Sequence, residues 1–108
     1  MASGAEVRVV LVTAPEGEAE GLARALVTEG LAACVNLVPG VRSIYRWEGK
    51  VQSDDEVLLL IKTTEVQVAA LTERVKALHS YDLPEVLALP AVGGSEPYLR
   101  WVVEEAGS

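Results

Sequence analysis

The thiol of Cys34 and the imidazole of His79 are the softest metal donors in this sequence. Cu(II) and Zn(II) favour such sulfur and nitrogen donors over carboxylate oxygens. The chain has one cysteine and one histidine, whereas a structural metal site takes about four protein ligands. Carboxylates, water or symmetry-related copies of the chain would have to complete the set. We therefore predict weak binding of Cu(II) or another divalent cation, with Cys34 and His79 as ligands.

Both residues also have interpretations that involve no metal. Cys34 stands among Ala33, Val35 and Leu37, and it fits a small buried side chain because free cysteines are among the most buried residues. His79 comes at the end of a predicted helix, where the helix dipole favours an imidazolium. It is equally compatible with a residue that simply forms the turn.

A second candidate site combines one basic, one acidic and three aromatic side chains. Lys62 ends an apolar segment and Glu85 begins the last predicted strand, so both flank the first strand in the expected sheet order. Tyr45, Trp47 and Tyr98 are expected nearby. We predict that these five residues form a ligand pocket. The alternative is a structural ion pair, with the aromatic side chains packed at a contact between subunits.

The sequence contains no arrangement that is typical of catalysis. Its serines and threonines have only His79 to act as a base, and no G-x-S-x-G motif frames any of them. The loop after the first predicted strand, residues 13–18, is acidic and would repel a phosphate group. The sequence therefore favours a binding protein over an enzyme.

The composition limits which binding partners and which cellular compartment are expected. Nine Lys and Arg against sixteen Asp and Glu give a formal charge of −7, which disfavours nucleic acid and anionic membranes as partners. The 108 residues fit one domain, residues 1–108, in which residues 1–5 are expected to be a flexible N-terminus. One cysteine allows no internal disulfide, and neither a signal peptide nor a membrane span is expected. These features predict a cytoplasmic protein.

Hydrophobic periodicity divides the chain into alternating strands and helices. Thr13 and Glu16 have the spacing of a capping box, which predicts the start of the first helix. The predicted elements begin with a strand over residues 7–12 and a helix ending at Gly30, followed by a hairpin of residues 33–47 and 51–63 interrupted near Pro39-Gly40 and at residues 53–55. A second helix follows a capping-box spacing of Thr64 and Gln67 and ends near His79-Ser80. A strand over residues 85–92 and a short C-terminal helix around Tyr98 and Trp101 complete the chain.

This order predicts an α+β fold, a βαββαβ sandwich with a long hairpin between its second and third strands. Right-handed crossovers place the first and third strands at the centre of the sheet and the two proline-containing strands at its edges. Both longer helices then cover one face. The other face is left open, so we predict a closed homo-oligomer in which the hairpin around Tyr45 and Trp47 packs against a neighbour.

Four motifs in order along the chain resemble those of one known family. They are AACVNLVPG at residues 32–40, SIYRWEGK at residues 43–50, LIKTT at residues 60–64 and HSYDLPE at residues 79–85. On these residues the chain resembles the CutA divalent-cation tolerance proteins, with a match that runs from about residue 9 to residue 101. The resemblance implies a ferredoxin-like subunit in a tight trimer built through the hairpin, in the manner of the PII signalling proteins.

The resemblance also implies a role in tolerance of copper and other divalent metals, although animal members have been connected with acetylcholinesterase processing. Some members carry a further cysteine where Val12 stands here, or two histidines where Leu78 and His79 stand here. Three functions follow as hypotheses. They are a trimeric copper-tolerance protein that binds metal weakly, a PII-like sensor of a small ligand in the groove between subunits, and a structural interaction module.

Overall fold

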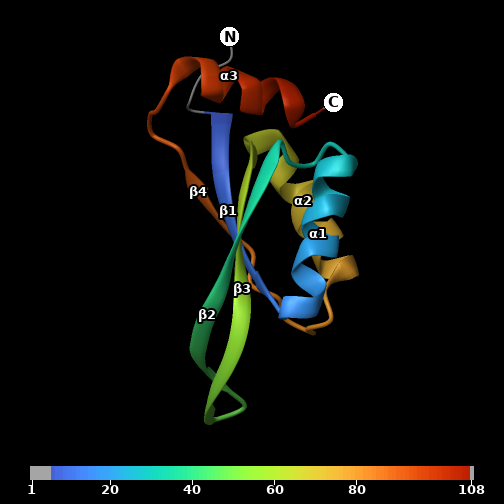
Figure 1. Cartoon of the computed structure of the whole chain (residues 1–108), viewed down its shortest axis with the longest axis vertical. Coiled ribbons are helices and arrows are strands. Elements are labelled where there is room, and N and C mark those ends of the chain that lie inside the picture. Colours follow the sequence, from blue (N-terminus) through green and yellow to red (C-terminus); the bar gives the residue numbers. More distant parts are fainter. Residues whose placement is uncertain (1–5, 108) are drawn as a thin grey trace.

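The computed structural model describes residues 6–107 as a mixed α and β fold (Figure 1). Residues 1–5, expected to be flexible, lie outside the described part, as does residue 108. The elements in chain order are β1 (Val7–Ala14), α1 (Glu16–Thr28), β2 (Cys34–Trp47), β3 (Lys50–Thr64), the 3₁₀ turn η2 (Glu65–Gln67), α2 (Val68–Leu78), β4 (Leu87–Pro90) and α3 (Glu96–Glu105).

The strands form one antiparallel sheet in the order β2-β3-β1-β4. The predicted α+β class and the ferredoxin-like order are confirmed, with β1 and β3 at the centre and the other two strands at the edges. The central strands carry the longest unbroken apolar runs, as expected for strands with a neighbour on each side. The prolines of β2 and β4 lie in edge strands, where a missing N–H costs little.

Helices α1 and α2 pack side by side on one face of the sheet, as predicted (Figure 1). Their buried positions repeat at helical spacing and meet every second residue of the central strands. The fully buried members of this aliphatic core include Val10, Val12, Leu26, Leu59, Ile61, Leu71 and Val75.

The opposite face of the sheet, here called the open face, is covered by neither of these helices. Strand register identifies it, because Leu11 alternates with the buried Val10 and Val12 and pairs with Leu60 and Leu87. Large apolar side chains on this face stay accessible in one chain, namely Val38 at 38%, Leu87 at 53% and Leu89 at 43%. Beyond the end where α3 packs on Val7, the open face is therefore apolar and accessible among the described residues.

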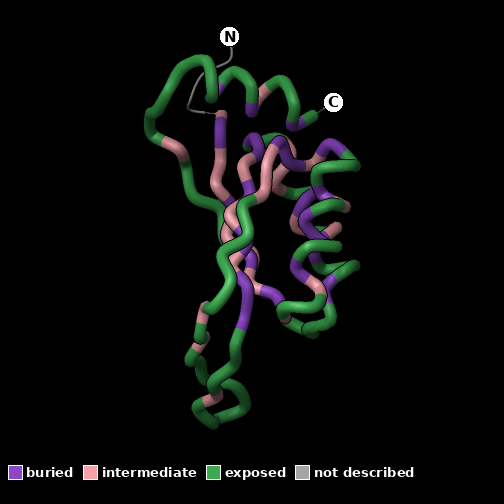
Figure 2. Tube along the Cα trace, viewed as in Figure 1, coloured by how far each residue is buried: buried purple, intermediate pink, exposed green. Residues whose placement is uncertain are grey.

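The hairpin of β2 and β3 extends well beyond the helices and makes the molecule 47 Å long (Figure 2). Its turn is formed by Glu48 and Gly49, both at positive φ, the conformation that suits a two-residue hairpin. The expected interruption at Pro39-Gly40 is confirmed as a register shift between Val38 and Val41. The expected interruption at residues 53–55 is wrong, because β3 pairs with β2 without a break there.

Two further boundary predictions are wrong. Thr13 does not cap α1, because β1 continues through it to Ala14, and Pro15 is the N-cap residue without any side-chain cap. The last strand is four residues long, shorter than residues 85–92, because only Leu87–Pro90 pairs with β1. The preceding segment turns away toward the hairpin.

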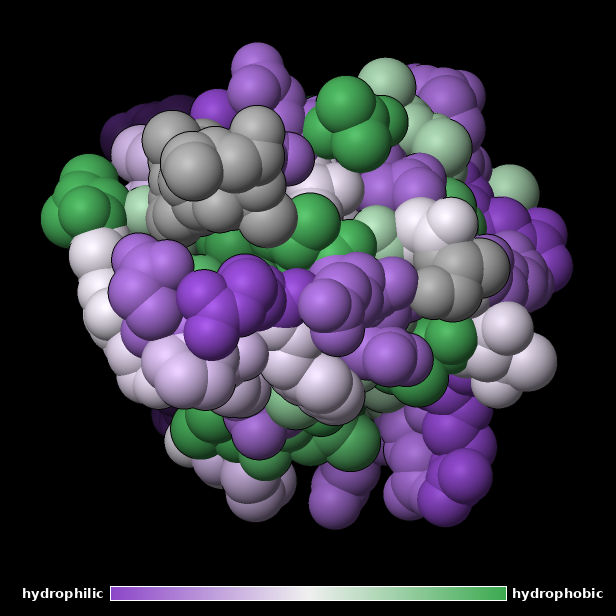
Figure 3. Space-filling model, turned by 90° about the horizontal axis from the view of Figure 1, so that it is seen from above, coloured by the Kyte–Doolittle hydropathy of each residue, from purple (hydrophilic) through white to green (hydrophobic). Residues whose placement is uncertain are grey.

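Helix α3 lies across the end of the sheet where β1 begins (Figure 1). It buries Leu99 and Val102 against Val7 and Ala33, which forms a small second core. From above, a band of hydrophilic side chains crosses this end, with hydrophobic side chains on both sides (Figure 3). No helix within residues 6–107 has the length and apolar character needed to cross a bilayer.

Candidate functional site

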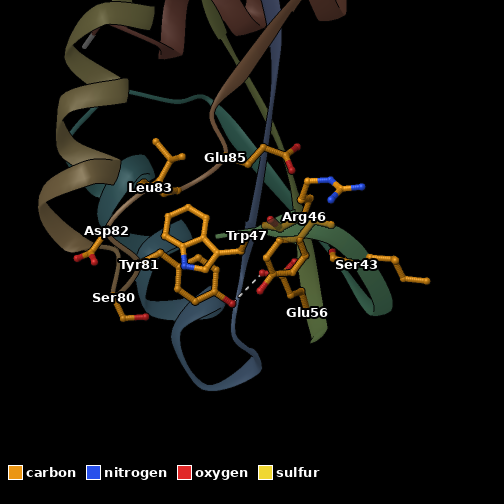
Figure 4. A pocket seen from close by; sticks show the side chains of 13 residues that line it. Ser43, Arg46, Trp47, Glu56, Ser80, Tyr81, Asp82, Leu83 and Glu85 are labelled. Carbon is orange, nitrogen blue, oxygen red and sulfur yellow. Dashed lines mark hydrogen bonds between the residues drawn. The ribbon is translucent and has the colours of Figure 1, made fainter. Parts of the chain in front are cut away.

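A cavity of about 790 Å³ opens between the hairpin and the segment of residues 80–85 that joins α2 to β4 (Figure 4). Such a volume is typical of sites for small molecules. The hairpin brings its side chains here because it overhangs the core. The cavity is lined by Thr13, Ser43, Ile44, Tyr45, Arg46, Trp47, Glu56, Ser80, Tyr81, Asp82, Leu83, Pro84 and Glu85.

The base of this cavity holds a buried carboxylate. Glu56 begins the apolar run of β3 and is 6% exposed. The hydroxyl of Tyr81 donates to its Oε2 at 2.9 Å, and Figure 4 shows this bond joining the two walls. Burial, and then the hydrogen bond to Glu56, raises the pKa of Tyr81 well above its usual range. The phenol therefore stays protonated and holds the segment of residues 80–85 to the sheet.

His79 anchors the start of the same segment. Its Nε2 lies 2.8 Å from the carbonyl oxygen of Thr13, and its Nδ1 accepts from the Tyr81 backbone N–H at 3.1 Å. Because a carbonyl only accepts, Nε2 carries the proton and the ring is the neutral tautomer. Its ring also lies 4.6 Å from that of Tyr81. Both nitrogens are thus used in holding the fold.

A second cluster surrounds Cys34 on the open face, near α3. Cys34 is partly exposed and lies 3.9 Å from the ammonium nitrogen of Lys62, which also donates to Asn36. Burial, and then the neighbouring sulfur, raises the pKa of Tyr98. The ring of Tyr98 lies 5.6 Å from that of Trp101. Within residues 6–107, Lys62 forms no ion pair with an acidic side chain.

Within one chain, the five residues predicted to share a pocket divide between these two places. Tyr45, Trp47 and Glu85 line the cavity, whereas Lys62 and Tyr98 lie beside Cys34.

The register explains why the two groups separate. Lys62 pairs with Val9, which pairs in turn with Leu89. Glu85 lies four residues before Leu89, which corresponds to roughly 13 Å of extended chain. The predicted metal ligands are separated in the same way, since Cys34 pairs with Lys62 while His79 binds Thr13, four residues beyond Val9.

Glu56 and Tyr81 are the functional candidates that the sequence did not single out. Tyr81 stands in the HSYDLPE motif, and Glu56 is the acidic residue directly before the apolar run of residues 57–61. An acidic residue directly before a continuous apolar run was the available signal, because such a run predicts a central strand and a buried carboxylate requires a partner.

The described residues of one chain do not form a closed metal site. No group of three or more His, Cys, Asp or Glu side chains within residues 6–107 lies in a position to hold an ion. The nitrogens of His79 are both occupied, and the ammonium of Lys62 beside Cys34 repels a cation.

Comparisons with known proteins agree on one family. Residues 8–105 match the family described as CutA1 divalent ion tolerance protein. The divalent-cation tolerance protein CutA of Thermus thermophilus is 56% identical over 100 residues, which cover 92% of this chain and 97% of the relative. The chloroplastic protein CutA of Arabidopsis thaliana is 59% identical over 95 residues. These cover 87% of this chain but 52% of the plant protein, so the chain spans about half of that relative's length.

The fold comparison gives the same result. The solved structure of the Thermus thermophilus protein has a TM-score of 0.91 at 55% identity and covers 94% of this chain and 99% of the other. The PII-like protein CutA from Nostoc has a TM-score of 0.86 at 37% identity over 92% of this chain and 96% of its own. With the four motifs, the sheet order and the long hairpin in agreement, the chain belongs to the CutA1 divalent ion tolerance family.

Proposed function

We propose that this chain acts as a homotrimer in tolerance of copper and other divalent cations, in the cytoplasm and by binding rather than by catalysis. Membership of the divalent ion tolerance family supports the role. The single cysteine supports a reducing compartment. The observation that carries the proposal is the open face, whose apolar side chains stay accessible within residues 6–107 and need a cover from another copy.

The open face continues onto the hairpin, where Tyr45 and Trp47 are 40% and 41% exposed. Contiguous apolar surface of this kind marks an interface. Three copies around one axis, each with its hairpin on a neighbour, would close the face on every subunit without leaving a free end. The likeness to a protein described as PII-like fits the trimer that the resemblance to the CutA family implies.

Light scattering after size exclusion tests the assembly. We expect the wild-type chain to elute with the mass of three 11.5 kDa copies. Leu87→Glu places a charge on the open face and should give single chains. Val66→Glu is the matched control, because Val66 is 85% exposed on η2, away from the sheet, and should leave the trimer intact. Folded single chains of the wild type at micromolar concentration would contradict the proposal.

We further propose that Cu(II) binds weakly, with Cys34 and His79 as donors. Weak affinity follows because an ion at His79 must displace a hydrogen bond to Thr13 or Tyr81. Calorimetry with Cu(II) should give a lower affinity for Cys34→Ser and for His79→Ala than for the wild type. Equal affinity in the wild type and in both variants would remove these residues from the site.

A second candidate function is a PII-like sensor of a small ligand. The cavity between the hairpin and residues 80–85 supports it, because Tyr45, Trp47 and Glu85 supply aromatic and polar groups in a concave site. A thermal-shift screen of metabolites tests it. A ligand that stabilises the wild type but not Trp47→Leu supports a sensor, and the absence of any such ligand speaks against one.

A further inference from the structure

We propose that helix α3 is a strap that opens independently of the rest of the fold and so controls access to one end of the open face. This device goes beyond the proposed function, which uses the open face but gives α3 no role. Three features of the described residues support it: a separate packing cluster, an exposed link that contains glycine, and a buried hydroxyl without a partner beneath the helix.

Helix α3 is packed separately from the two longer helices. Its buried Leu99 and Val102 belong to the small second core together with Val7 and Ala33, and none of these four residues is part of the main core beneath α1 and α2. A segment with few buried apolar contacts of its own opens at a lower free energy than the whole fold. The packing therefore allows α3 to leave the sheet while the main core stays intact.

The connections at the two ends of α3 permit such a movement. Residues 92–95, which join β4 to α3, are exposed and belong to no helix or strand (Figure 2). Gly94 in this link has a φ of +149°, a conformation that is open to glycine and that other residues rarely adopt. At the other end, the backbone N–H of Gly107 donates to the carbonyl oxygen of Gly30 at 2.8 Å. Rotation in the link lifts α3 once this hydrogen bond breaks.

Thr64 lies on the face of the sheet that α3 covers. It pairs with Val7 across the sheet, and directly paired residues project to the same face. Thr64 is 3% exposed, and its Oγ1 is the one buried side-chain polar atom within residues 6–107 that has no hydrogen-bond partner. A buried hydroxyl without a partner destabilises the closed form, and water satisfies the hydroxyl once α3 lifts. Thr64 therefore favours opening of the strap.

Opening changes what can be reached at this end of the open face. The apolar side chains of Val7 and Ala33, which are buried in the closed form, become accessible. Cys34 follows Ala33 directly, and Tyr98 of α3 lies beside its sulfur, so the thiol loses this neighbour as well. The position of α3 thereby sets how much apolar surface this end of the sheet presents.

Hydrogen–deuterium exchange of the full chain, measured by mass spectrometry, tests the proposal. We expect the amides of α3 to exchange at least about tenfold faster than the buried amides of β1 and β3. Thr64→Val removes the unpaired hydroxyl at nearly constant volume and should slow exchange in α3 by about five- to a hundredfold. Leu99→Ala removes packing beneath α3 and should speed exchange there by at least about tenfold.

Thr13→Val is the matched control, because Thr13 is half-buried in the sheet near the end of β1 opposite to Val7. Exchange in α3 should stay within about threefold of the wild type in this variant. Circular dichroism verifies the fold of each variant, and Thr64→Val keeps the test decisive if Leu99→Ala unfolds. The proposal is overturned if α3 of the wild type exchanges as slowly as the buried amides of β1 and β3. It is equally overturned if folded Thr64→Val exchanges in α3 at the rate of the wild type.

Discussion

Replacing His79 by Phe tests how the segment of residues 80–85 is held in place. Phe keeps a ring next to Tyr81 but removes the bond to the Thr13 carbonyl at 2.8 Å and the bond from the Tyr81 N–H at 3.1 Å. A net contribution of about 0.5 to 1.5 kcal/mol for each bond gives a loss of about 1 to 3 kcal/mol. With an ordinary denaturant slope, the urea midpoint should fall by roughly 1 M.

The assay is equilibrium unfolding in urea, followed by circular dichroism at one fixed protein concentration, since the proposed assembly would make stability depend on protein concentration. Ser80→Ala is the matched control. Ser80 is exposed, and its hydrogen bond is donated by its backbone N–H to Glu18. The free energy of unfolding of Ser80→Ala should therefore stay within about 0.5 kcal/mol of the wild type. An unchanged midpoint for His79→Phe would show that the two hydrogen bonds of His79 do not hold residues 80–85 in place.

Two other predictions follow from the structure. The pKa values of Tyr45, Tyr81 and Tyr98 are all raised in the folded chain. Their contribution to stability is therefore complete below the usual tyrosine pKa of about 10 and is lost as the pH rises above it. Absorbance titration should show phenolate forming at higher pH in the folded than in the unfolded chain, and coincident curves would contradict this. Gly49→Ala should cost about 1 kcal/mol in urea unfolding because Gly49 has a φ of +80°, whereas Gly21→Ala inside α1 meets open space and should stabilise by about 1 kcal/mol. If both substitutions changed the free energy of unfolding in the same direction, the argument from the backbone angles would be refuted.

The element order and the sheet could be predicted from the sequence because they depend on local patterns. Continuous apolar runs marked the two central strands, and Pro39, Pro84 and Pro90 marked the edge segments. The end of β1 could not be placed in this way. Thr13 has the spacing of a helix cap, but its pairing with Leu58 extends the strand, and that pairing depends on tertiary structure.

The candidate site was predicted only in part, because it depends on distances across the sheet. The sequence grouped the aromatic residues of the hairpin with Glu85, and in the structure Tyr45, Trp47 and Glu85 line one cavity. Lys62 was placed with them because it flanks the same strand, but register separates it from Glu85 by roughly four residues of strand length. The bond between Tyr81 and Glu56 joins positions 25 residues apart, and local patterns do not reveal it.

Growth in copper tests most directly whether the assembly built on the open face is the functional form. A bacterial strain without its own CutA protein would carry the wild type, Leu87→Glu or the control Val66→Glu, with equal amounts of folded protein. We predict that the wild type and Val66→Glu restore growth at raised Cu(II), and that Leu87→Glu, as a single chain, does not. Full rescue by a monomeric Leu87→Glu protein would contradict the account.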